Sequence, residues 1–200
     1  MGDRVAVMRK GELQQADEPQ ELYDHPVNLF VAGFIGSPAM NMLEATLERD
    51  DGAMKVVTGS QEIQLSEETL SQRPALRGYE GRKVVLGIRP EDLEDHQLAG
   101  ETAHGGTLEG TVTLREALGA EIMVHFSVDA PPAFTADVKE LAEDVGEAER
   151  AEAHAGEGTA VIVGRFGARS RVRPGEHVDV AVDTRQLHFF DVDTGLGVYA

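Results

Sequence analysis

The densest group of side chains that could do chemistry is EDLEDH at residues 91–96, with four carboxylates and one imidazole. Carboxylates and an imidazole at this spacing could bind a divalent cation or exchange protons with a substrate. Either role needs further groups that converge from elsewhere in the chain. Because the sequence indicates no such second set, we interpret the cluster as a solvated turn.

Motifs of self-contained active sites are absent from the 200 residues. The chain has no GxxxxGK followed by Ser or Thr, no GxGxxG, no GxSxG and no HExxH. No two of its seven histidines have the i, i+4 spacing of zinc ligands on a helix, and it has no cysteine for a disulfide or a thiolate site. We therefore predict no catalytic residue, no metal site and no cofactor-binding residue.

Two short stretches stand out at the ends of apolar runs. Pro90 follows Arg89 directly after a buried-strand pattern, so Arg89 should be extended, and Glu91 lies close enough to pair with it or to cap the next turn. We predict that Gly87, Arg89, Pro90 and Glu91 form a structural corner. In Phe189-Phe190, neighbouring strand residues face opposite sides, so we expect one in the core and one facing outward.

The elements that position these residues change in character near residue 37. Before it, a hairpin over residues 4–16 and helices over 17–23 and 28–35 are predicted, the second ending at Gly36-Ser37-Pro38. A lone hairpin is marginal in water, so its partners are expected upstream. The apolar face of the second helix is expected to be loosely held, or packed on the barrel or on a second copy of the chain.

Beyond Pro38 the apolar period becomes two, with many short strands and glycine-rich turns, which favours a mainly β fold, a small barrel or sandwich. Residues 137–158 depart from this pattern and are interpreted as an acidic, mobile insertion, with a helix over 137–145 as an alternative. The strands are predicted at residues 41–48, 54–57, 62–65, 84–88, 108–116, 121–128, 159–163, 167–172, 177–182 and 187–191.

Composition excludes several partners. The 36 acidic and 18 basic residues give a formal charge of −18, which repels phosphate backbones and anionic lipid, so we expect no nucleic-acid binding. No apolar run approaches the roughly 20 residues that span a bilayer, and the N-terminus has no signal-peptide pattern, so no direct membrane insertion is expected.

Two motifs carry a family resemblance. DRVAVMRKGELQQADEPQELYDHPVNLFVAGFIGSPAMN, residues 3–41, resembles the end of the nucleotide-binding domain of carbohydrate-import ABC transporter ATPases of the maltose and multiple-sugar type. LGIRPEDL, residues 86–93, resembles the signature of the transport-associated OB (TOBE) domain that follows it. The resemblance implies an α/β remnant of the ATPase domain at residues 1–37, and an OB-like β-barrel regulatory domain at 38–200.

The resemblance also implies a division of labour. The phosphate-binding loop, the metal-binding strand, the signature loop and the switch histidine of this family lie upstream, so ATP and Mg²⁺ would belong to the full-length parent and this fragment would be non-catalytic. The implied partners are a second copy bound through the regulatory domain, ABC permease subunits of the parent, and a regulatory protein. The implied location is the cytoplasmic face of the cell membrane. An outward Phe190, with Phe189 beside it, is the predicted dimer contact.

Two other functions remain open. An OB-like barrel could sense a small anion or sugar, although we expect no cluster of Lys, Arg, Ser and Thr donors on a single loop to support it. An independent oligonucleotide-binding OB-fold would need a basic face with stacking aromatic residues, against which the net charge argues.

Overall fold

Two five-stranded antiparallel sheets make up most of the computed structural model, which describes residues 3–50, 52–100, 105–133, 135, 138 and 158–199. The first sheet has the order β12-β6-β3-β4-β5. Its longest strand, β3, alternates buried and half-buried side chains, which is the pattern of a strand with one face on the core. The strands are β3 (Asn41–Asp50), β4 (Ala53–Thr58), β5 (Gln61–Gln64), β6 (Lys83–Ile88) and β12 (His188–Asp191).

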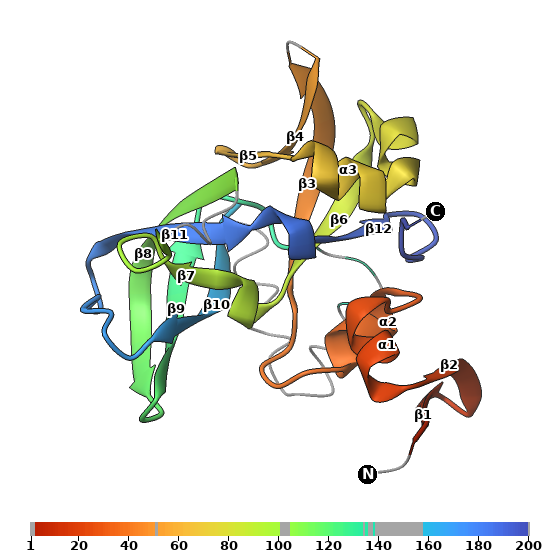
Figure 1. Cartoon of the computed structure of the whole chain (residues 1–200), viewed down its shortest axis with the longest axis horizontal. Coiled ribbons are helices and arrows are strands. Elements are labelled where there is room, and N and C mark those ends of the chain that lie inside the picture. Colours follow the sequence, from red (N-terminus) through yellow and green to blue (C-terminus); the bar gives the residue numbers. More distant parts are fainter. Residues whose placement is uncertain are drawn as a thin grey trace.

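The second sheet has the order β10-β9-β8-β11-β7 and is built around the long hairpin of β8 and β9. Strand order does not follow chain order in either sheet. The last strand, β12, returns to pair with β6 of the first sheet, and β7 pairs with β11 of the second (Figure 1). The strands are β7 (Leu93–Asp95), β8 (Gly105–Ala117), β9 (Glu121–Val128), β10 (Ala160–Gly167) and β11 (His177–Asp183).

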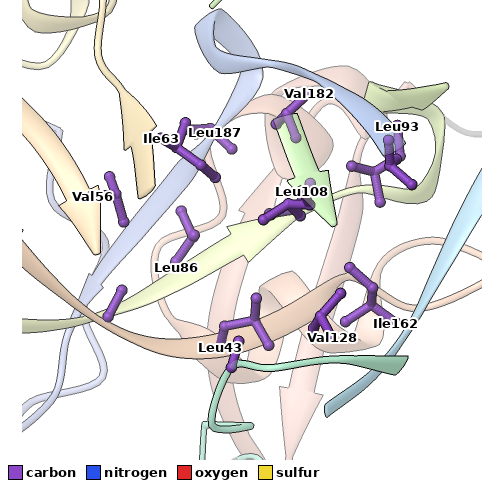
Figure 2. Close-up of a cluster of buried hydrophobic side chains, with 14 of the residues drawn as sticks. Leu43, Val56, Ile63, Leu86, Leu93, Leu108, Val128, Ile162, Val182 and Leu187 are labelled. Carbon is purple, nitrogen blue, oxygen red and sulfur yellow. The ribbon is translucent and has the colours of Figure 1, made fainter. Parts of the chain in front are cut away.

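One hydrophobic core joins the two sheets. Figure 2 shows side chains from both sheets pointing toward one another, among them Leu43 and Leu86 of the first and Leu108 and Ile162 of the second. Each of these four is at most 2% exposed. Burial of apolar surface on this scale is the main stabilising contribution in such a fold. The prediction of a mainly β fold is therefore confirmed.

The N-terminal segment forms a hairpin and two short helices, and the helices lie between the hairpin and the first sheet (Figure 1). Asn28 caps the second helix by accepting a hydrogen bond from the Val31 N–H. Leu29 and Ala32 of that helix pack against Phe190, so its apolar face lies on the first sheet. Of the expected arrangements, the structure shows packing on the barrel. The elements are β1 (Val5–Arg9), β2 (Glu12–Asp17), α1 (Pro19–Asp24) and α2 (Leu29–Phe34).

One predicted strand does not form, and one helix was not predicted. The strand expected at residues 167–172 does not form, because β10 ends at Gly167 and the Ser170 N–H turns back to the Gly167 carbonyl. The helix α3 (Glu67–Gln72) was missed, although Ser66 caps it and two glutamates occupy its first turn. A 3-10 helix at Pro74–Tyr79 follows it.

Most of the predicted acidic insertion at residues 137–158 lies outside the described residues, apart from Val138 and Gly158. The division of the chain at residues 37 and 38 stays a prediction. Within the described ranges, no helix is long and apolar enough to cross a membrane.

Candidate functional site at the junction of the N-terminal segment and the sheets

Arg89 is the central residue of the contact between the N-terminal helices and the first sheet. It is 2% exposed and extended, as Pro90 predicts, with φ −75° and ψ 147°. Its guanidinium group donates to the Ile35 carbonyl at 3.0 Å and to the Tyr23 carbonyl, and lies 3.5 Å from the centroid of the Tyr23 ring. One side chain thus holds the ends of α1 and α2 against the end of β6.

The charge of Arg89 is held away from water. Burial lowers its pKa to about 10, which still leaves it protonated at neutral pH. Carbonyl oxygens and an aromatic face contact the cation directly, and the negative charge of Asp92 stabilises it without a hydrogen bond. The predicted pairing of Arg89 with Glu91 is wrong, because Glu91 is exposed and the guanidinium points toward the N-terminal helices.

Gly36 makes room for this arrangement. Its φ of +121° is a conformation that other residues rarely adopt, and a Cβ there would lie 3.3 Å from Nη1 of Arg89. The next peptide bond, between Ser37 and Pro38, is cis. The sequence indicated the Gly36 break and the Arg89 corner as separate features, and the structure brings them into contact.

Gly87 is required by packing rather than by backbone conformation. A Cβ there would collide with Sδ of Met40 and lie 3.1 Å from Cβ of His188. The predicted structural role of Gly87 therefore has a specific cause, the close approach of β12 and Met40 to β6.

Phe189 and Phe190 are both fully buried. Phe189 belongs to the core between the sheets, whereas Phe190 packs with Leu29, Met40 and Val85. The prediction that Phe190 faces outward is wrong, because α2 covers that face of β12. Neither side chain is available for a dimer contact in this structure.

The C-terminal residues complete the junction, and sequence reasoning missed them. Backbone hydrogen bonds join Gly197 to Val27 and Leu29 to Gly195, each at 2.9 Å, and the Tyr199 hydroxyl donates to the Pro26 carbonyl at 3.0 Å. Residues 26–29 are therefore tied to the C-terminal residues 195–199 beside β12.

Two titratable groups near the junction have strongly shifted pKa values. Burial, helped by the positive charges of Arg89 and Arg73, lowers the pKa of His188 to about 3, so its ring is neutral. Burial, with the negative charges of Glu91 and Asp183 next in importance, raises the pKa of Asp92 to about 7. Asp92 lines an open cavity of about 120 Å³ together with Glu91, Glu94, Ala99, Ala181 and Asp183.

Two carboxylates of the cluster at residues 91–96 make hydrogen bonds that hold the fold together. Glu94 accepts from the Gly167 N–H at 3.0 Å, and the buried Asp95 accepts from the Ser170 hydroxyl at 2.6 Å. Among the described residues, no group of three or more His, Cys, Asp or Glu side chains is arranged to hold a metal ion. These carboxylates fix the loop after β10.

The loop after β10 contradicts the expectation that no single loop carries a cluster of Lys, Arg, Ser and Thr donors. Residues 165–173, RFGARSRVR, place four arginines and one serine on a short stretch, so a donor cluster on a single segment is present. The signal was visible in the sequence as the densest basic run of an acidic chain.

Comparison with known families now identifies the domains. A model described as the MalK OB fold domain matches residues 36–93, and one described as the TOBE domain matches residues 86–148. The chain contains a MalK OB-fold domain and a TOBE domain. They are the C-terminal domains of carbohydrate-import ABC ATP-binding proteins, and the predicted resemblance is confirmed. The two matches overlap at LGIRPEDL, the stretch that contains Arg89.

Relatives agree with this identification. The chain is 38% identical over all 200 residues to the trehalose/maltose import ATP-binding protein MalK of Thermococcus litoralis, covering 45% of that protein. It is 38% identical to the trehalose import ATP-binding protein SugC of Mycobacterium tuberculosis over 98% of this chain and 47% of SugC. It is 32% identical to the oligosaccharides import ATP-binding protein MsmX of Bacillus subtilis over 97% of this chain and 44% of MsmX. The chain thus spans less than half the length of these relatives.

Proposed function

We propose that this chain is the regulatory part of the ATP-binding subunit of a carbohydrate importer, and that it pairs with a second copy while the ATPase domains move. The contact around Arg89 carries the proposal. It joins a segment that resembles the end of an ATPase domain to the OB-fold domain through one buried side chain. Movement of the N-terminal helices would therefore directly displace β6 and β12.

In this proposal the chain does not hydrolyse ATP. Nucleotide, Mg²⁺ and the permease subunits bind to the full-length parent protein. Other components of the transporter determine which sugar is transported. The subunit works at the cytoplasmic face of the membrane, where a regulatory protein is a further partner. A β-rich domain suits the pairing role, since its contacts with a second copy need not change when nucleotide is bound or released.

With Phe190 buried, the pairing surface needs other apolar side chains that are exposed. Leu114, near the end of β8, is 47% exposed, and Leu118, in the turn before β9, is 59% exposed. They form neighbouring apolar positions at the tip of the longest hairpin, and we assign the contact between copies to this tip.

Equilibrium sedimentation of the 200-residue chain tests the pairing. We expect a self-associating species, and a clearly weaker association in the variant Leu114→Gln/Leu118→Gln. The matched control is Met8→Gln/Leu13→Gln, which removes two equally exposed side chains from the N-terminal hairpin and should leave the association unchanged. A monomer at high protein concentration would refute the pairing, and equal weakening in both variants would refute the hairpin tip as its site.

Measurement of ATP hydrolysis by the same protein tests the other half of the proposal. We expect turnover at the background rate of the buffer. If turnover exceeds this background but disappears when the chain is purified further, it comes from a contaminant. Turnover that co-purifies with the chain would contradict a non-catalytic role.

A further inference from the structure

A basic pocket lies at one end of the second sheet. Its residues are distant from Arg89 in the sequence, and the function proposed above gives them no role. It is formed by Arg115 of β8 and by residues of the loop between β10 and β11, and its volume is about 280 Å³. The full lining is Arg115, Ser170, Arg171, Val172 and Arg173. Three arginines therefore line one open cavity in a protein whose formal charge is −18.

The loop that carries Arg171 and Arg173 is anchored at both ends. Before them, the Ser170 hydroxyl donates to buried Asp95 at 2.6 Å. After them, the Gly175 N–H donates to the Val112 carbonyl at 2.7 Å. Between the two arginines, Val172 packs against the core of the sheets. The arginines are therefore presented from a fixed backbone, which reduces the entropy that a bound ligand would have to remove.

The tertiary fold, rather than the sequence, brings Arg115 to this loop. Hydrogen bonds between Val112 and the residues Gly175 and Glu176 align the loop with β8. Since Arg115 lies three residues further along β8, it reaches the same cavity as Arg171 and Arg173.

The guanidinium groups of these three arginines have no carboxylate partner within the described ranges of the chain. Other arginines do have one: Arg49 lies 2.9 Å from Glu80, and Arg185 lies 2.7 Å from Asp183. The acidic groups next to the pocket are already engaged, since Asp95 binds Ser170 and Glu176 accepts from the backbone N–H of Arg173. Like charges that line one cavity repel, and a bound anion would relieve the repulsion.

We propose that this pocket binds a small phosphate-type oxyanion, either inorganic phosphate or the phosphate group of a small soluble molecule. Guanidinium forks match phosphate oxygens in pairs, which a point charge such as Lys does not. The pocket is local and the rest of the chain is strongly acidic, so a long polyanion or an anionic membrane is repelled much more strongly than a small anion that contacts only the pocket.

Thermal unfolding and isothermal titration calorimetry of the 200-residue chain test the site, with inorganic phosphate as the probe and sodium chloride adjusted to constant ionic strength. We expect saturable binding with a Kd in the millimolar range or tighter, and a Tm that rises with phosphate concentration. In Arg171→Gln/Arg173→Gln the affinity should fall about tenfold or more, because each charge-assisted hydrogen bond is worth about that factor.

The matched control is Arg49→Gln/Arg77→Gln, which makes the same change in net charge at two exposed arginines paired with Glu80 and Glu67. It should bind phosphate as the parent chain does. Absence of saturable binding to the parent, or equal loss in both double variants, would overturn the proposal.

A second arm separates a soluble phosphate from a lipid headgroup. The chain is sedimented with vesicles of phosphatidylglycerol and phosphatidylcholine at the same ionic strength. We expect it to remain in the supernatant. Vesicle binding that depends on Arg171 and Arg173, without binding of inorganic phosphate, would overturn the assignment to a small soluble anion.

Discussion

Arginines occupy two contrasting regions of this molecule. At the junction, Arg89 is 2% exposed, and its two Nη groups donate to the Ile35 and Tyr23 carbonyls. In the pocket beside β8, Arg171 and Arg173 are exposed and without a carboxylate partner in the described part of the chain. Both sets follow a strand with buried residues. The difference teaches that burial and available acceptors, rather than residue type, separate a structural arginine from a candidate binding arginine.

Replacement of Arg89 should have the largest effect on stability. Arg89→Met keeps much of the side-chain volume but removes the donor from two part-buried carbonyl groups, and we expect a loss of about 3 kcal/mol in the free energy of unfolding. Arg89→Lys should recover only part of this, because one ammonium group cannot reproduce both hydrogen bonds and the contact with the Tyr23 ring. Urea denaturation measures both values.

The exposed Arg77 provides the control for this prediction, since Arg77→Met removes a cation whose partner Glu67 is also exposed. Its unfolding free energy should stay within about 0.5 kcal/mol of the parent. A loss for Arg89→Met as small as that of the control would show that the junction is not held by Arg89.

Two titratable groups near the junction should give opposite pH dependences. The pKa of His188 is about 3 in the folded chain against an ordinary 6.5, so its contribution to stability is present above 6.5 and lost as the pH falls toward 3. The pKa of Asp92 is about 7 against an ordinary 3.8, so its contribution is present below 3.8 and lost as the pH rises toward 7. Between pH 4 and 6.5 the two effects oppose each other.

Single variants separate these effects. Relative to the parent chain, His188→Gln should gain stability as the pH falls from 6.5 to 4, and Asp92→Asn should gain as the pH rises over the same range. Each slope should be at most about 1.4 kcal/mol per pH unit, the value for one proton. Urea midpoints at several pH values measure them. Parallel pH profiles for the two variants and the parent would contradict the assigned shifts.

The smallest effect on stability is expected in the basic pocket. Arg171→Gln/Arg173→Gln removes two exposed cations that repel each other, so the unfolding free energy without phosphate should change by no more than about 0.5 kcal/mol. The same urea titration measures it. A loss comparable to that of Arg89→Met would show that these arginines are structural, and the contrast between the two regions would fail.

Local signals in the sequence predicted much of the fold. Period-two runs predicted most strands, the Asn28 cap predicted the start of α2, and Pro90 predicted an extended Arg89. The strand expected over residues 167–172 failed because its backbone turns to bring Ser170 to Asp95, a partner 75 residues away. Alternation alone could not reveal that partner.

The candidate site was less predictable than the fold. Phe190 was expected to face outward because neighbouring strand residues point to opposite faces. They do so here, but the opposite face is exposed to solvent only when nothing covers it. Helix α2 covers the second face, and nothing in the sequence near Phe190 indicates it. For Arg89, the choice between Glu91 and the carbonyls of a distant helix likewise depended on which groups the fold placed within reach.

By itself, the sequence determined the mainly β architecture, the break at Gly36-Ser37-Pro38 and the resemblance to a carbohydrate-importer subunit, because each depends on residue type and spacing along the chain. Only the tertiary structure decided which side chains come together: Arg89 meets Tyr23, Phe190 meets Leu29, and Arg115 lines the same cavity as Arg171. The physical reason is that hydrogen bonding, burial and charge repulsion act over a few ångströms in space, whatever the separation of the residues in the chain.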